Sequence, residues 1–270
     1  MLKKYNRTFF FYGLSLLLPW LLWFLTAYIS HNSNNLILLQ GFLGLLGLLS
    51  PVFVSAYLFY SDKELLADLK QRLFHFKSFN PIYGIFSIFL IFTSMVLAQL
   101  ISVLFGHSLN QFYISGTPSF SSALFSPWFI LIFAPIVEEL AWHSYGTDTL
   151  RRKFNLFKTS IIFAVYWTFW HLPLSFIKGY YHSNIIADGW IYSVNFIFSL
   201  FVFVILMNWL YYKTNRNILI TIFFHLSANI SNEIFATHPD SKVIQTFILS
   251  IITIVVLIKE KDLFLQKIYD

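Results

Sequence analysis

Long apolar stretches separated by short polar segments dominate the pattern of this 270-residue chain. A helix that crosses a bilayer needs about 20 apolar residues. Eight stretches reach or approach that length, of which the last is the shortest: 9–30, 36–60, 82–105, 126–146, 159–177, 190–212, 218–235 and 243–258. No linker rich in Pro, Gly or Ser and no internal repeat divides them. The pattern predicts an all-α fold, a single integral membrane domain over residues 1–270 built as a polytopic transmembrane helical bundle of about eight spans.

The composition supports a membrane location and excludes other classes of protein. Hydrophobic residues make up 57% of the chain and charged residues 11%, whereas soluble domains carry about 25% charged residues. A net charge of +6 could indicate a nucleic-acid partner, but the basic residues lie in short tracts between apolar runs, so we expect none. The chain has no cysteine, which excludes disulfides and thiolate metal sites. We expect a multi-pass protein of the cell membrane that contacts lipid.

The distribution of basic residues predicts the orientation. Both termini and every second loop carry Lys or Arg, and the opposite side keeps only Lys178 and Lys242. By the positive-inside rule, both termini therefore lie in the cytoplasm, and the number of spans is even. Sixteen of the 18 basic residues fall on the cytoplasmic side: Lys3, Lys4, Arg7, Lys63, Lys70, Arg72, Lys77, Arg151, Arg152, Lys153, Lys158, Lys213, Arg216, Lys259, Lys261 and Lys267.

The loop 61–79 is amphipathic. Leucines recur in it at helical spacing beside basic residues, which predicts a short helix lying on the inner leaflet. A role in docking a substrate is the alternative.

Few ionisable residues remain within the predicted spans. Each costs at least about 2.5–3.5 kcal/mol at bilayer depth, so such residues usually face a polar cavity and serve a function. Glu233, near the outer end of its span, is expected to reach water instead. The others are Glu138, Glu139, His143, His171 and His225.

The predicted topology also gives the depth of these groups. Glu138, His171 and Asn229 each lie 13 residues from a basic residue of a cytoplasmic loop, which is about 20 Å along a helix. His225 is one turn nearer the cytoplasm. The hydrocarbon core is about 30 Å thick. All four groups should therefore lie at similar heights, between the inner boundary and the midplane, on three helices that can converge.

The side-chain types point to hydrolysis. A glutamate can take a proton from water and a histidine can position that water, so Glu138 and His171 are candidate catalytic residues. His225 and Asn229 share a helical face and can stabilise an oxyanion. Glu139 and His143, also four residues apart, are expected to form a supporting pair.

A metal centre is the alternative for the same side chains. Glu138, His171 and His225 could bind Zn²⁺ with water as the fourth ligand. The chain lacks the His-Glu-x-x-His helix of soluble metalloproteases. From the residues alone, a site without a metal or other cofactor and a Zn²⁺ site both stay open.

Three segments resemble a family pattern: 138–143 (EELAWH), 167–173 (WTFWHLP) and 225–229 (HLSAN). They are similar to the motifs Glu-Glu-x-x-x-Arg, Phe-x-x-x-His and His-x-x-x-Asn of the CPBP intramembrane proteases. That family contains type II CAAX prenyl endopeptidases and bacteriocin-processing and immunity proteins. The resemblance covers roughly residues 120–235. It implies that Glu138 and His171 activate water, that His225 and Asn229 stabilise the oxyanion, and that the enzyme is of the glutamate type. On this resemblance we favour a site without a metal or other cofactor and keep Zn²⁺ as a possible ligand.

Two positions depart from the family pattern. Trp167 replaces Phe and keeps an aromatic wall, whereas His143 replaces Arg, which changes a permanent bidentate cation into a titratable ring. The sequence thus predicts an intramembrane endopeptidase that cleaves a peptide or protein substrate near the cytoplasmic side. One alternative is a non-catalytic bacteriocin immunity or peptide-binding protein that uses the same cavity. Another is a small transporter with Glu138 and Glu139 as a proton relay.

Overall fold

The computed structural model describes residues 2–74 and 80–267, so Lys77, counted above among the cytoplasmic charges, lies outside the described residues. The described chain is all-α, as the apolar pattern predicts. Its helices are α1 (Thr8–Asn32), η1 (Asn34–Leu36), α2 (Ile37–Tyr60), α3 (Lys63–Phe74), α4 (Pro81–Leu104), η3 (Leu109–Phe112), α5 (Pro127–Ala141), η4 (Trp142–Gly146), α6 (Thr147–Arg151), α7 (Leu156–His171), η5 (Leu172–Phe176), α8 (Tyr181–Asp188), α9 (Trp190–Lys213), α10 (Ile218–Glu233), α11 (Pro239–Lys259) and α12 (Lys261–Leu265).

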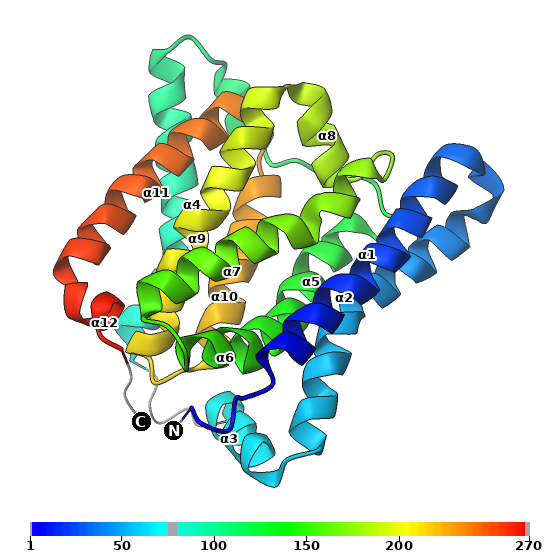
Figure 1. Cartoon of the computed structure of the whole chain (residues 1–270). Coiled ribbons are helices and arrows are strands. Elements are labelled where there is room, and N and C mark those ends of the chain that lie inside the picture. Colours follow the sequence, from blue (N-terminus) through cyan, green and yellow to red (C-terminus); the bar gives the residue numbers. More distant parts are fainter. Residues whose placement is uncertain (1, 75–79, 268–270) are drawn as a thin grey trace.

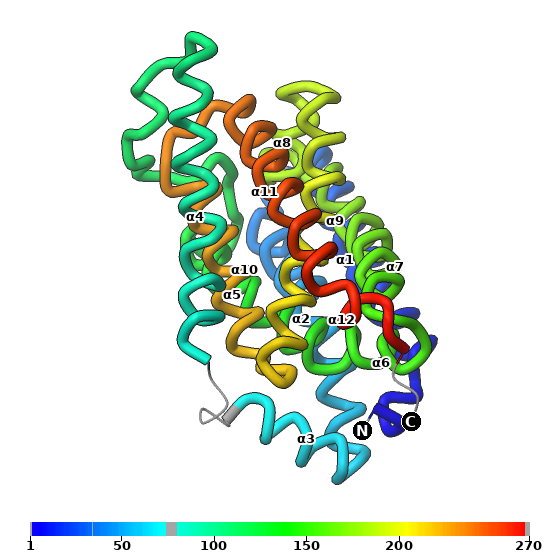
Figure 2. The backbone as a smooth tube through the Cα atoms, turned by 90° about the vertical axis from the view of Figure 1, so that its left-hand side faces the viewer, coloured from blue at the N-terminus to red at the C-terminus, as the bar shows by residue number. Residues whose placement is uncertain are grey.

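The long helices form a bundle with two different ends (Figures 1 and 2). Both termini, α3, α6 and α12 lie at one end, which we call the base, and α8 lies at the opposite end, which we call the distal end. Helix α5 packs against α2 and α10, and α9 packs against α7 and α11. The helices α5, α7 and α10, which carry the three motif segments, therefore each pack against other long helices of the bundle.

The bundle contains several helices that can cross a membrane. Five are long and apolar enough by themselves: α1, α2, α4, α9 and α11. The pair formed by Leu156–Phe176 and α8, bent by 84°, raises the number to six when it is counted as one span. Many large apolar side chains on the bundle remain exposed, Phe9 to 87% and Leu104 to 83%. Such surfaces need lipid rather than water around them, which makes the chain a multi-pass membrane protein.

Two motif-bearing helices, α5 and α10, are shorter, with 15 and 16 residues. Helix α5 does not stop at Ala141. It continues through the π-helical turn η4 into α6, which ends at Arg151. The last predicted stretch, 243–258, belongs to α11, whose 21 residues qualify as a span.

The starts of the motif-bearing helices are capped by side chains. Ser126 accepts a hydrogen bond from the amide of Phe129 before α5. Asn155 and Asn217 cap α7 and α10 in the same way. Because each such cap contributes about 1 kcal/mol and fixes where a helix begins, the caps set the register of the residues that follow.

A buried ionic group at the base joins α3 to η4, and we call it the base network. Arg72 is only 6% exposed. It donates to the carbonyl oxygens of His143 and Ser144, at 3.0 and 2.8 Å, at the π-helical turn. Helix α3 is the expected amphipathic helix, but Arg72 is not the solvated charge that the topology count assumes. The other members of the network are Tyr5, Asp68, Asp148, Tyr211 and Arg216.

Candidate active site

The residues proposed from the sequence as catalytic line one cavity of about 850 Å³. Glu138 comes from α5, His171 from the end of α7, and His225 and Asn229 from α10. Glu139 and His143 are absent from the cavity wall and are 0% exposed. In the described structure, four side chains can thus contact a ligand in the cavity. Glu139 and His143 are buried behind the cavity wall.

Glu138 lies against two indole groups. Its Oε2 atom accepts hydrogen bonds from Trp167 at 3.2 Å and from Trp142 at 3.5 Å, and the residue is 7% exposed. Two donors on one oxygen fix the carboxylate and leave the other oxygen to a water molecule or a ligand. The sequence pattern predicts only an aromatic wall at Trp167 and not this hydrogen bond to Glu138.

His171 is held by a local backbone bond. Its Nδ1 atom lies 2.7 Å from the carbonyl oxygen of Trp167, one turn earlier in α7. A carbonyl oxygen only accepts, so Nδ1 carries the proton, and the lone pair of Nε2 is available to a water or substrate. The ring of Trp167 contacts both His171 and His225, with centroid separations of 5.2 and 5.4 Å.

Glu139 bridges two histidines. Its Oε1 atom lies 2.8 Å from Nδ1 of His225, and its Oε2 atom contacts Nδ1 of His143. The i,i+4 pair of Glu139 and His143 agrees with the expectation from spacing. The bond to His225 was missed, because spacing along one helix says nothing about a partner on another. His225 therefore has Nδ1 fixed by a carboxylate, which leaves Nε2 for the cavity.

The second nitrogen of His143 also faces an acceptor. Nε2 lies 3.0 Å from Oδ1 of Asn208, and the Asn208 amide donates to the hydroxyl of Ser160 at 2.9 Å. Glu139 and Asn208 can both accept a hydrogen bond, so each ring nitrogen of His143 can act as a donor. His143 can thus reproduce two donors of the Arg in the family pattern. Asn208, an amide within an apolar stretch, was the available sequence signal for this partner.

Asn229 and Glu233 lie toward the distal part of the cavity wall. The Asn229 amide donates to the carbonyl oxygen of Leu131 at 3.2 Å, which leaves its second proton available. The prediction that Glu233 reaches water is wrong, because its side chain is buried. It is 4% exposed, accepts from the amide of Ser119 at 2.6 Å and pairs with Lys242 at 3.4 Å. This opposite charge replaces water around the carboxylate.

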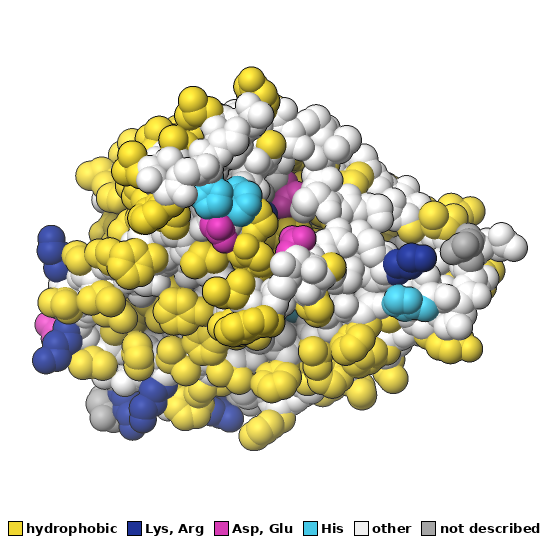
Figure 3. Space-filling view, turned by 90° about the horizontal axis from the view of Figure 1, so that it is seen from above, with side chains coloured by type: hydrophobic (Ala, Val, Ile, Leu, Met, Phe, Trp, Pro, Cys, Tyr) yellow, Lys and Arg dark blue, Asp and Glu magenta, His cyan; other side chains and the backbone are white. Residues whose placement is uncertain are grey.

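The cavity extends from the four side chains toward the distal end. Its wall includes the segment 119–125, residues 177–188 around α8, and the start of α11. Within the described chain, no residue of α3, α6 or α12 contributes to it. The space-filling view of the distal end shows hydrophobic side chains around acidic ones (Figure 3). If both termini lie in the cytoplasm, the distal end lies on the extracytoplasmic side. The predicted orientation therefore disagrees with the prediction that a substrate enters the cavity from the cytoplasm.

A zinc centre at the four side chains has little geometric support. Over residues 2–74 and 80–267, one group of three His, Asp or Glu side chains has all its ligand atoms within 4.8 Å of one another. That group is His107, His238 and Asp240, and it does not include Glu138, His171 or His225. The side chains of the cavity therefore do not form a compact set of zinc ligands.

Two comparisons identify similar proteins. The family model "Type II CAAX prenyl endopeptidase Rce1-like" matches residues 120–231, which include all three motif segments. The chain is also similar to "CAAX prenyl protease 2" of Methanococcus maripaludis. The two are 33% identical over 273 residues, and the alignment covers 98% of each chain.

Proposed function

The chain belongs to the family of Rce1-like type II CAAX prenyl endopeptidases, and we propose that it hydrolyses a peptide bond inside the membrane without a metal ion. The observation that carries this proposal is the cavity that Glu138, His171, His225 and Asn229 share. A carboxylate, two imidazoles and an amide supply a base, a proton carrier and oxyanion donors in a space large enough for a peptide segment.

In the proposed reaction, Glu138 takes a proton from a water molecule that Nε2 of His171 also orients. The hydroxide attacks the scissile carbonyl carbon, and the C–N bond breaks as Glu138 returns the proton to the leaving nitrogen. The two indole donors keep one Glu138 oxygen in place during this transfer. General base catalysis of this kind contributes typically about 10²–10⁴-fold to the rate.

We assign the oxyanion to His225 and Asn229. The Glu139 carboxylate accepts the Nδ1 proton of His225 and holds the ring so that Nε2 faces the cavity, where its protonated form donates to the oxyanion. Asn229 has one amide proton on the carbonyl of Leu131 and a second one free to donate. His143 supports Glu139 from the side opposite His225.

The substrate in this proposal is a peptide segment that reaches the cavity from the membrane or its surface. The family name implies a peptide substrate, and the relative in Methanococcus maripaludis is named for a CAAX prenyl protease. The wall carries apolar and aromatic side chains beside the polar ones, which suits a substrate with an apolar chain.

We further propose eight crossings, formed by α1, α2, α4, the continuous α5–η4–α6, α7–η5, α9, α10 and α11, with both termini in the cytoplasm. The positive-inside rule supports this orientation, because Lys178 and Lys242 alone are left for the other side. The cavity then opens at the extracytoplasmic face, and this replaces the expectation of cytoplasmic access.

Activity can be tested on purified protein with a library of membrane-associated peptides, analysed by mass spectrometry. Wild type should generate defined cleavage products, and Glu138→Gln, His171→Ala and His225→Ala should not. Glu233→Gln is the matched control, because it removes another buried carboxylate of the same cavity outside the proposed machinery. Equal cleavage by the wild type and all three variants would end the proposal.

The absence of cysteine makes orientation directly measurable. Single cysteines at Asn6, Asn110 and Ser199 report on the base, the distal end and the cavity. An impermeant thiol reagent outside intact cells should label Asn110→Cys and Ser199→Cys but not Asn6→Cys. Labelling of Asn6→Cys alone would reverse the orientation and give the cavity cytoplasmic access.

The immunity or peptide-binding alternative uses the same cavity without chemistry. Both comparisons name proteases, and neither points to bacteriocin immunity. Glu138→Gln distinguishes the two functions, since it should abolish cleavage but leave binding or protection intact.

A further inference from the structure

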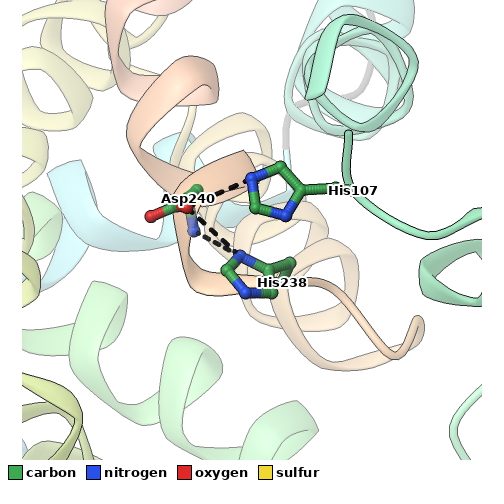
Figure 4. A group of neighbouring side chains, drawn as sticks. All are labelled: His107, His238 and Asp240. Atoms are coloured by element: carbon green, nitrogen blue, oxygen red, sulfur yellow. Dashed lines mark hydrogen bonds and ion pairs between the residues drawn. The ribbon is translucent and has the colours of Figure 1, made fainter. Parts of the chain in front are cut away.

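Three metal-ligating side chains meet at the distal end, and none of them is among the four residues of the proposed active site (Figure 4). His107 follows α4 directly after Gly106, whose positive φ of 92° turns the chain. His238 is the N-cap residue of α11, and Asp240 lies in the first turn of that helix. Two histidines and one aspartate thus converge from segments more than 130 residues apart.

The distances within the group are those of a metal site. Nε2 of His107 lies 3.1 Å from Oδ2 of Asp240, and Nδ1 of His238 lies 3.6 Å from the same oxygen. The centroids of the two imidazole rings are 4.2 Å apart. Tetrahedral zinc ligands at 2.0–2.2 Å from the metal are separated by about 3.3 Å. Small side-chain movements would therefore place all three donors around one ion.

The hydrogen bonds around the group define the atoms that a metal ion would meet. The amide of Asp240 donates to Nδ1 of His238 at 3.2 Å, so that nitrogen carries no proton, and a metal ion bound there would replace this capping bond. The hydroxyl of Tyr192 donates to Oδ1 of Asp240 at 2.8 Å and leaves Oδ2 toward the histidines. A donor of this kind behind a ligating carboxylate is typical of zinc sites.

We propose that His107, His238 and Asp240 bind a divalent transition metal, with Zn²⁺ as the best fit and water in the fourth position. Two imidazoles and a carboxylate suit Zn²⁺ better than Mg²⁺ or Ca²⁺, which prefer oxygen ligands. His107 and Asp240 are 23% and 45% exposed at the side chain, so an ion can enter from the aqueous phase.

The metal would join the end of α4 to the start of α11. Thr237, Pro239 and Lys242 surround the two ligands of α11 in the sequence and line the cavity. A bound ion would therefore fix one wall of the cavity near its mouth. The role is structural and separate from the chemistry at Glu138.

The test is zinc binding by purified full-length protein, prepared without a histidine tag and stripped with a chelator. Wild type should take up one Zn²⁺ in competition with a fluorescent zinc indicator. His107→Ala and Asp240→Asn should lose that site, and Tyr192→Phe should weaken it by about tenfold. His31→Ala is the control, because His31 is another exposed histidine, on α1, outside the group.

A second measurement separates this site from the cavity. Glu138→Gln should keep the full zinc stoichiometry, because Glu138 is not a ligand of the group. Zinc should also raise the thermal unfolding temperature of wild type but not of His107→Ala. The proposal is overturned if wild type takes up no zinc, if His107→Ala binds it as wild type does, or if Glu138→Gln loses it.

Discussion

Arg72 provides the sharpest prediction about how the base supports the site. Arg72→Gln removes a buried guanidinium that pairs with Asp68 and Asp148 at 2.8 and 3.2 Å and donates to two carbonyls of the π-helical turn. Loss of one partner of a buried ion pair costs about 3–5 kcal/mol. Arg216 still contacts both carboxylates after the change, so we expect the low end, about 3 kcal/mol.

The assay is reversible unfolding in mixed micelles of detergent and SDS, followed by tryptophan fluorescence. Lys70→Gln is the matched control, since it removes the same charge from an exposed position of α3. We expect that variant to stay within about 0.5 kcal/mol of wild type. Activity should fall with Arg72→Gln, because the turn that it holds contains His143, the partner of Glu139.

A double variant tests the pairing itself. Asp68→Asn combined with Arg72→Gln removes one charge of each sign from the network. It should cost less than the sum of the two single changes, by about 0.5–3 kcal/mol. Additive costs, or an Arg72→Gln variant as stable as Lys70→Gln, would refute the account of the base network.

Three further predictions concern the site and the pH dependence of stability. His143→Arg should preserve or raise activity, because a guanidinium can donate to both Glu139 and Asn208; complete loss in a peptidase assay would contradict this. Trp167→Phe should lower kcat/KM by no more than about tenfold, since Trp142 still donates to Glu138; loss of all activity would contradict it. Burial opposes ionisation of Asp68, but Arg72 and Arg216 outweigh it and hold the pKa of Asp68 well below its usual range. The contribution of Asp68 to the free energy of unfolding should be constant above about pH 5 and decline below about pH 4, in unfolding curves measured against pH. A decline of this contribution already at pH 6 would contradict the prediction.

Much of the fold could be predicted from the sequence. Long apolar stretches show where helices run, because a lipid-facing helix must be apolar along its length. Equal distances from basic loops predicted that Glu138, His171 and Asn229 lie at similar heights, and all three line one cavity. The number of crossings stays a prediction, because α5 and α10 are short and carry the polar side chains.

Contacts between helices could not be predicted in the same way. Spacing identified the pair of Glu139 and His143 on one helix, but it could not show that Glu139 also meets His225 from α10. The burial of Arg72 was equally hidden, since an arginine on an amphipathic helix has the same sequence pattern whether it faces water or a buried aspartate. Such partners depend on how helices pack, which no single periodicity encodes.

The direction of the cavity was hidden for a related reason. The position of a residue along a helix predicts its height in the membrane. It does not show toward which end of the bundle the cavity beside that residue extends. Two segments at the distal end form one cavity wall with α10, although they are separated from it in sequence: 119–125 and 177–188. Their contribution becomes visible only in three dimensions.

The role of Glu138 as the base that activates water is the central claim, and one measurement tests it most directly. Single-turnover cleavage of one identified peptide should be compared between wild type and Glu138→Gln, with the Kd of the peptide measured in parallel. We predict a rate loss of about 10²–10⁴-fold with an unchanged Kd. Cleavage by Glu138→Gln at the wild-type rate, with the same Kd, would contradict the account.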